Sequence, residues 1–175
     1  MKLLISAIHF ASRAHAGQLR KDKLTPYINH PLEVMQLLSK HGDVRNETFL
    51  CAAVLHDIVE DTSITIRDIE KLFNTRIASI VWEVTDDKDT PKQERKRLQA
   101  ERAHLLSEGA KLIRLADKIS NVKDILHAPP ASWDIAERRK YVLWTREVVQ
   151  PIRGINPPLE LMYDELLVRA DDILK

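Results

Sequence analysis

Four ionisable side chains close an otherwise apolar stretch near the middle of the first half of the chain. The run Phe49–Val59 is almost wholly apolar, and His56, Asp57, Glu60 and Asp61 fall at its end. We expect one buried helix over residues 46–60, in which the four groups share one arc at roughly 0°, 100°, 40° and 140° around the axis. Burying unpaired carboxylates costs several kcal/mol each, roughly, and a bound cation is the simplest compensation. The stretch therefore predicts a metal site.

Two further residues could complete such a site. His30 stands beside Pro31 at an expected helix start, and Asp117 lies on an expected helix over residues 112–126. With His56 and Asp57 they give two imidazoles and two carboxylates, a set without thiolate that suits an octahedral divalent ion such as manganese. Zinc and iron remain alternatives. Glu60 and Asp61, one turn further on, could orient a water bound to the ion and carry its proton.

Each of these residues also has a purely structural interpretation. A lone buried histidine such as His30 is commonly a hydrogen-bonded core residue. Asp117 is followed directly by Lys118, and the two could form a surface ion pair. The residue pattern alone suggests the site without establishing it.

Two groups of cations could bring an anionic substrate to the site. The loop before His30 is basic, and so is a helix expected to begin with Thr90 as its N-cap and Pro91 in its first turn. A polyphosphate would suit both groups, which are Arg20, Lys21 and Lys23 in the loop and Lys92, Arg95 and Lys96 in the helix. Glu94 and Glu101 interleave with the helix cations, so a solvated helix face is an equal alternative there.

Composition narrows the classes of protein. The 175 residues suit one domain, and 27 Lys and Arg against 26 Asp and Glu give a net charge of +1. Such a balance predicts no global attraction to nucleic acid or to an anionic membrane. The single cysteine, Cys51, excludes an intramolecular disulfide and a thiolate cluster. No 18-residue apolar span and no signal-peptide pattern occur, so we expect a cytoplasmic protein.

The hydrophobic spacing predicts an all-α fold of about eight to ten helices with no significant sheet, in one domain over residues 1–175. Helices are expected over residues 2–16, stopped by Gly17, from Pro31 to near Gly42, and over 46–60. A capping box of Thr65 and Asp68 opens a short helix, and another covers the apolar positions from 77 to 84. Gly109 is expected to break the chain before the helix 112–126, and two last helices cover 136–150 and 158–174.

Five motifs in this order resemble the HD-domain hydrolases of the RelA/SpoT group, and in particular the stand-alone small alarmone hydrolases that include the metazoan SpoT-homologue type. The resemblance covers roughly residues 1–150. Its motifs are Gly-Gln-Leu-Arg-Lys at 17–21, Thr-Pro-Tyr-Ile-Asn-His-Pro at 25–31, His56-Asp57 with Glu60-Asp61, Glu83–Lys88 with Pro91–Lys96, and Leu-Ala-Asp-Lys-Ile-Ser-Asn at 115–121.

This resemblance implies a helical HD fold that hydrolyses the 3′-pyrophosphate of guanosine tetra- or pentaphosphate (ppGpp or pppGpp), yielding GDP or GTP and pyrophosphate. It implies no synthetase activity, because the chain has no room for that domain. It also implies roles for individual residues: manganese held by His30, His56, Asp57 and Asp117, water activated by Glu60 and Asp61, and the nucleotide held by Arg20, Lys21 and Asn121.

Two other functions remain open at this level. An HD phosphatase could act on another nucleotide, such as NADPH, an adenosine-based alarmone or a nucleoside 5′-monophosphate, because the metal chemistry is indifferent to the base. A silent sensor that only binds an alarmone would have no need of Glu60 and Asp61. The oligomeric state is not predicted.

Overall fold

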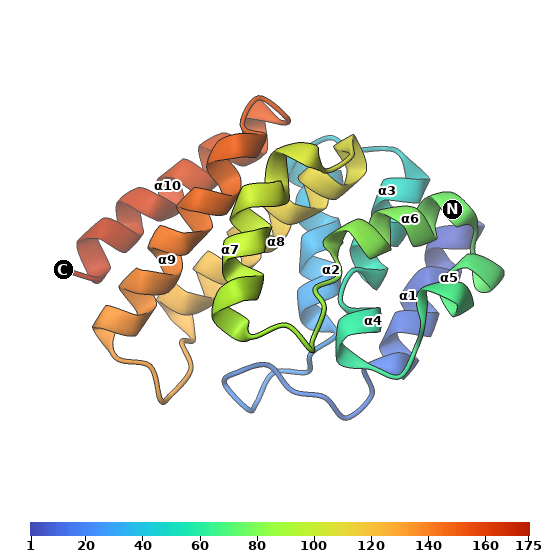
Figure 1. Ribbon diagram of the computed structural model, residues 1–175, viewed down its shortest axis with the longest axis horizontal. Helices are drawn as coiled ribbons and strands as arrows, with labels where there is room; N and C mark the ends of the chain where they lie inside the picture. The colour runs from blue at the N-terminus through green and yellow to red at the C-terminus, as the bar shows by residue number, and fades with distance from the viewer.

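The computed structural model describes all of residues 1–175 as a bundle of α-helices (Figure 1). The all-α prediction is confirmed: the only β-type pairing is an isolated bridge between Leu19 and Pro26. Ten α-helices follow one another along the chain, namely α1 Lys2–Ala14, α2 Asn29–Gln36, α3 Glu47–Leu55, α4 Ile58–Asp61, α5 Ile66–Leu72, α6 Thr75–Val84, α7 Lys92–Arg102, α8 Glu108–His127, α9 Ile135–Val149 and α10 Pro157–Ile173.

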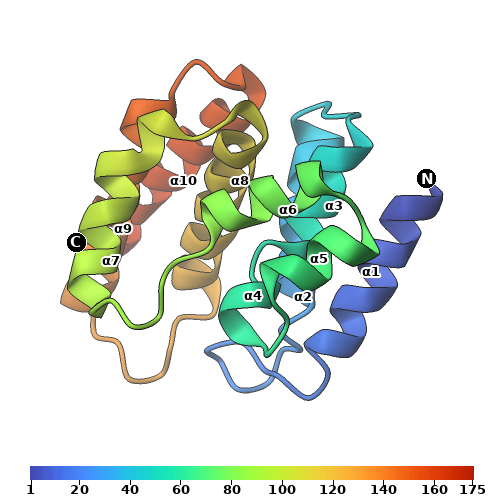
Figure 2. The same cartoon turned by 45° about the vertical axis from the view of Figure 1, so that its right-hand side comes forward.

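Helix α8 is the central element of the bundle. It runs for 20 residues, 13 of them buried, and packs against α2, α3 and α6 as well as α9 and α10. In both ribbon views it separates α9 and α10 from the N-terminal helices (Figures 1 and 2). The expected apolar stripe is confirmed, since Leu112, Leu115, Ala116, Ile119 and Val122 are buried in one core of 36 residues. Whatever α8 carries on its polar positions is therefore held rigidly in the middle of the protein.

The expected continuous helix over residues 46–60 is wrong in one respect. Helix α3 ends at Leu55, and α4 begins at Ile58, so His56 and Asp57 form a turn between them. His56 Nδ1 donates to the Ala53 carbonyl, which is the acceptor that the Asp57 N–H would use in an uninterrupted helix. The predicted arc of His56, Asp57, Glu60 and Asp61 around a single helix axis is therefore wrong, because the chain turns between α3 and α4.

Two expected helix boundaries also need correction. Helix α7 begins at Lys92 with Pro91 as its N-cap, and the Thr90 hydroxyl donates to Asp87 instead of capping the helix. Gly109 does not break the chain but lies buried in the first turn of α8. A Cβ there would meet the Phe49 ring at 2.8 Å, so the glycine permits close packing of α8 against α3. Helix α2 ends at Gln36, but a π-helix over Leu37–His41 continues it to the expected end near Gly42. The other expected helices, and the capping box of Thr65 and Asp68, are confirmed to within about two residues.

None of the helices is both long enough and apolar enough to cross a membrane.

The position of α8 generates a prediction about stability. Leu115 is fully buried on α8, whereas Leu161 on α10 is 63% exposed. Leu115→Ala should lower the free energy of unfolding by about 2–5 kcal/mol, because it leaves a cavity in close-packed surroundings. The matched variant Leu161→Ala should change it by less than about 0.5 kcal/mol. Urea unfolding followed by circular dichroism measures both, and similar losses in the two variants would contradict the central position of α8.

Candidate metal centre and phosphate-binding cavity

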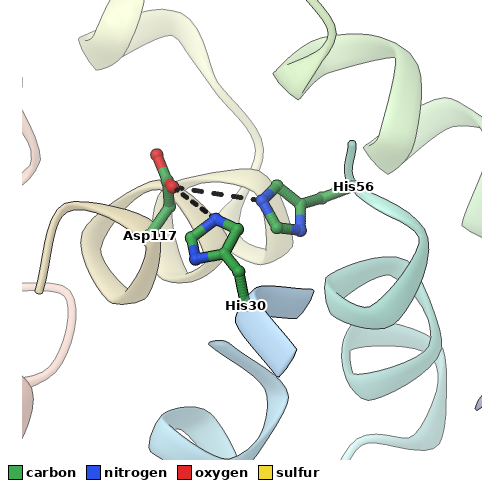
Figure 3. Close-up of side chains that lie close together, drawn as sticks. All are labelled: His30, His56 and Asp117. Atoms are coloured by element: carbon green, nitrogen blue, oxygen red, sulfur yellow. Dashed lines mark ion pairs between the residues drawn. The ribbon is translucent and has the colours of Figure 1, made fainter. Parts of the chain in front are cut away.

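Two histidines and two aspartates from three separate segments meet at one point. His30 comes from the first turn of α2, His56 and Asp57 from the α3–α4 turn, and Asp117 from the middle of α8. Figure 3 shows the rings of His30 and His56 directed at the Asp117 carboxylate. Asp117 Oδ1 lies 3.2 Å from His30 Nε2 and 4.0 Å from His56 Nε2. Asp57 adds Oδ1 at 3.2 Å from His56 Nε2 and Oδ2 at 3.5 Å from His30 Nε2.

These separations match the coordination shell of a divalent ion. With metal–ligand bonds of about 2.1 Å, adjacent ligands of an octahedron are about 3.0 Å apart and opposite ligands about 4.2 Å apart. The four measured separations lie between 3.2 and 4.0 Å. His56 Nε2 is also buried without any hydrogen bond, which leaves its lone pair free for an ion. His30, His56 and Asp117 could thus hold a metal ion, with Asp57 beside them.

Hydrogen bonds behind the rings direct Nε2 of both histidines to this point. Ser120 Oγ donates to Glu33 Oε2 at 2.7 Å, so it can accept a hydrogen bond from His30 Nδ1 at 2.9 Å. His56 Nδ1 donates to the Ala53 carbonyl at 2.8 Å. In each neutral ring the proton therefore sits on Nδ1, and Nε2 presents its lone pair to the cluster.

The two carboxylates of the cluster are negatively charged, and Lys118 offsets part of the charge of Asp117. Burial opposes the charged forms of Asp57 and Asp117, yet the adjoining histidines and, for Asp117, Lys118 hold the pKa of both carboxyls below its usual range. Burial alone would lower the pKa of His56, but the charges of Asp57 and Asp117 raise it to about 9. Burial lowers the pKa of His30. The point between the two rings thus favours a positive charge, which a divalent ion can supply in place of a proton on His56.

Glu60 and Asp61 line the same cavity as the four candidate ligands. Glu60 accepts a hydrogen bond from Arg95 Nη1 at 3.2 Å. Burial and the charges of Asp57, Asp86 and Asp61 raise the pKa of Glu60 to about 7, where a carboxylate exchanges protons readily at neutral pH. Asp61 is more exposed and pairs with Lys88 at 3.3 Å. The pair can therefore serve a water molecule inside this cavity.

The predicted substrate-binding residues stand at one edge of the cavity, which measures about 660 Å³. Arg20 donates to Asp124 Oδ2 at 2.5 Å and to Asn121 Oδ1 at 3.2 Å, and Asn121 donates to Asp117 Oδ1 at 2.5 Å. Arg20, Lys21 and Asn121 also line a neighbouring cavity of about 740 Å³ beside α2. These three residues therefore lie between the cluster and a second space large enough for part of a nucleotide.

The structure decides between the alternatives left open by the sequence. Asp117 and Lys118 do form an ion pair, at 2.9 Å, but both side chains are buried, so the surface pair is wrong. On α7, Lys92, Arg95 and Lys96 face the cavity, whereas Arg97 pairs with Glu94 and Glu101 on the solvent side. The helix is thus a cavity wall on one face and a solvated surface on the other.

Sequence reasoning missed several residues that support the site. Tyr27 donates to Asp57 Oδ2 at 2.6 Å, and Ser120 and Glu33 fix the His30 ring. Tyr27 lies three residues before His30 in the motif Thr-Pro-Tyr-Ile-Asn-His-Pro, so the sequence contained a signal for it. The others, together with the aromatic residues Trp133, Tyr141 and Trp144 of the cavity wall, become visible only when distant segments are brought together.

An all-helical fold with a buried His/Asp cluster, an adjacent carboxylate pair and a cationic cavity defines a class of metal-dependent phosphohydrolase. A family model described as HD domain matches residues 7–146. The chain belongs to the HD-domain family, and this family implies a divalent metal.

Relatives with closely similar sequences and structures are known. The guanosine-3′,5′-bis(diphosphate) 3′-pyrophosphohydrolase MESH1 of Xenopus tropicalis is 46% identical over 167 residues, covering 95% of this chain and 93% of that protein. The human protein of the same name is 44% identical, covering 90% and 88%. A solved structure of a metazoan orthologue of SpoT that hydrolyses ppGpp matches with a TM-score of 0.94 at 43% identity, covering 97% of this chain and 96% of that chain.

The hydrogen bonds behind His30 generate a prediction about metal affinity. Ser120→Ala removes the group that orients the ring, so we expect the affinity for a divalent ion to fall by about 10-fold or more while the fold persists. Isothermal titration of the metal-stripped protein with manganese measures the change. Ser79→Ala, at an exposed position on α6, is the matched control and should bind as the unmodified protein does. Equal affinity in both variants would show that Ser120 does not support a ligand.

Proposed function

We propose that this chain is a metal-dependent hydrolase that removes the 3′-pyrophosphate of ppGpp or pppGpp and yields GDP or GTP. One observation carries the proposal: a buried cluster fit for a divalent ion shares its cavity with a carboxylate pair and several cations. The relatives at 44–46% identity, which the chain matches over most of its length, are named for this activity. The proposal joins a site suited to phosphate chemistry with the substrate of those relatives.

We further propose that His30, His56, Asp57 and Asp117 hold a single manganese ion. Their mixed nitrogen and oxygen donors, without thiolate, suit an ion of this kind and leave room for water and a phosphate oxygen in an octahedral shell. When bound, such an ion polarises a phosphoryl oxygen and acidifies a water molecule. Manganese, in preference to zinc or iron, is part of the proposal.

In this proposal, Glu60 and Asp61 act on the attacking water. The water oxygen forms a bond to the phosphorus attached to the ribose 3′-oxygen, and the bond from that phosphorus to the 3′-oxygen breaks. Glu60, with its pKa near 7, takes the proton from the water while Asp61 orients it. A proton returns to the 3′-oxygen, so the nucleotide leaves with a 3′-hydroxyl and the two phosphates leave together as pyrophosphate.

Arg20, Lys21 and Asn121 are the residues proposed to hold the nucleotide. They line both the cavity that contains the cluster and the neighbouring cavity beside α2. A nucleotide that places its 3′-phosphate at the cluster can therefore extend its nucleoside past these three side chains. Their cations and amide suit phosphate oxygens and the polar edges of a base or ribose.

A panel of substrates tests the proposed function. Metal-stripped protein is supplied with manganese, zinc or magnesium in turn and is given ppGpp, NADPH and guanosine 5′-monophosphate side by side. We expect manganese-dependent release of pyrophosphate from ppGpp to exceed phosphate release from the other two. A preference for NADPH or the monophosphate would support the alternative nucleotide phosphatase, and binding of ppGpp without turnover would support the sensor.

The carboxylate pair generates the sharpest kinetic prediction. The double variant Glu60→Gln with Asp61→Asn keeps the size of both side chains but removes their basicity. We expect kcat on ppGpp to fall by about 10²–10⁴-fold, as for the loss of a general base, with the metal content unchanged. Pyrophosphate release and metal analysis measure the two quantities. Glu70→Gln, on the exposed face of α5, is the control. Near-normal turnover in the double variant would remove the pair from the mechanism.

A further inference from the structure

One part of the cavity wall has a cationic cluster without counter-charges. Of the seven cationic side chains that line the cavity, three contact a carboxylate: Arg20 with Asp124, Arg95 with Glu60, and Lys118 with Asp117. Arg114 donates to the carbonyl of Val84. The three others, Lys21, Lys92 and Lys96, have no hydrogen-bond or ion-pair partner for their ammonium groups.

Three aromatic rings hold these ammonium groups together. Lys21 Nζ lies 5.4 Å from the centroid of the Trp133 ring and 5.5 Å from that of Tyr141. Lys92 Nζ lies 5.9 Å from Trp133, and Lys96 Nζ lies 5.1 Å from Tyr141 and 4.7 Å from Trp144. The rings contact one another, with centroids 5.5 and 5.2 Å apart. Cation–π contacts of this kind favour each lysine singly but do not cancel the repulsion between them.

Three like charges converge in this assembly, and an anion that joined it would offset their repulsion. Three segments supply it: the loop after α1 gives Lys21, α7 gives Lys92 and Lys96, and the segment from Trp133 into α9 gives the rings. Burial and the neighbouring cations lower the pKa of Lys21 and of Lys96, as expected where like charges converge. Three converging ammonium donors match the several oxygens of a terminal phosphate group.

Lys118 connects this lysine cluster to the metal centre. Its Nζ donates to Asp117 Oδ2 at 2.9 Å and lies 4.5 Å from the centroid of the Trp144 ring, where Lys96 also stands. Phosphate held beside Asp117 therefore has the lysine cluster next to it in the same cavity. A single phosphate at the metal centre would leave Lys21, Lys92 and Lys96 unpaired, whereas a second phosphoryl group attached to it would extend toward them.

We propose that Lys21, Lys92 and Lys96, backed by Trp133, Tyr141 and Trp144, form a subsite for the distal phosphate of a 3′-diphosphate, and that this subsite makes the enzyme prefer a diphosphate to a monophosphate at the 3′ position. The inference rests on the proposed function and specifies its substrate class. The lysine cluster binds the phosphate that does not react and takes no part in bond breaking.

Two substrates that differ only in this phosphate test the subsite. Guanosine 5′-diphosphate 3′-diphosphate and guanosine 5′-diphosphate 3′-monophosphate share the bond that breaks, and both yield GDP. The unmodified protein should show the higher kcat/KM with the 3′-diphosphate.

Lys92→Met and Lys96→Met keep an unbranched apolar stem but remove the charge. Each should lower kcat/KM with the 3′-diphosphate by about 10- to 100-fold, as for the loss of one hydrogen bond to a charged group. With the 3′-monophosphate, kcat/KM should change by no more than about 2-fold, because this substrate has no distal phosphate for either lysine to bind.

Controls separate this inference from the proposed function. Lys71→Met, on α5 outside the cavity, should leave both substrates unaffected. An equal loss on both substrates would assign the lysines to the 5′-phosphates or to a general field, and no loss on either would remove them from the site; both results overturn the inference but leave the activity intact. An unmodified protein that hydrolyses neither substrate would defeat the proposed function.

A binding measurement keeps the subsite testable in that last case. Trp133 and Trp144 lie within the lysine cluster, so their fluorescence should report on a bound anion. Pyrophosphate should bind the unmodified manganese-loaded protein more tightly than phosphate does, and Lys96→Met should remove this preference. Equal affinity of the unmodified protein for the two anions would contradict a subsite for a second phosphoryl group.

Discussion

The arrangement of the helices depends on the charge balance of two carboxylates that stand beside two buried histidines. Asp117 is buried, the Asp57 side chain is 19% exposed, and their oxygen atoms face the Nε2 atoms of His30 and His56. In an apolar interior such a group of atoms is stable only around a positive charge. Lys118 pairs with Asp117, and a proton on His56 supplies one further charge at most. A divalent ion supplies two and also satisfies the imidazole lone pairs, so the cluster is best understood as a centre made for an ion.

The helices are arranged to keep this centre rigid while leaving one side open. Helix α8 carries Asp117 through the core, and α2 carries His30 with its ring fixed through Ser120 and Glu33. The turn between α3 and α4 contributes His56 and Asp57 and then presents Glu60 to the cavity. On the open side, α7 and α9 add cations and aromatic rings. Ligands positioned by helices on one side and unpaired cations on the other suit a site for a metal ion and a phosphate group.

Much of this could be predicted from the sequence, for physical reasons. Apolar spacing determines the faces of α8, and the ionisable groups at the end of an apolar run reveal a site because burial of charge is costly. The continuous helix through His56 was wrong because periodicity does not register a side-chain hydrogen bond to the Ala53 carbonyl. Gly109 was misjudged because its role is defined by the Phe49 ring, a contact between distant segments. The three lysines were predicted from the sequence as cations for a polyphosphate. Their convergence on the rings of Trp133, Tyr141 and Trp144 was not predicted, because the lysines and rings come from three segments of the chain.

The most direct test of the account is a crystal structure of the manganese-loaded protein with anomalous diffraction data collected at the manganese edge. We expect one strong anomalous peak per chain, within about 2.0–2.3 Å of His30 Nε2, of His56 Nε2 and of a carboxylate oxygen from each of Asp57 and Asp117. A peak at any other position, or a well-ordered cluster without a peak in manganese-saturated crystals, would contradict it.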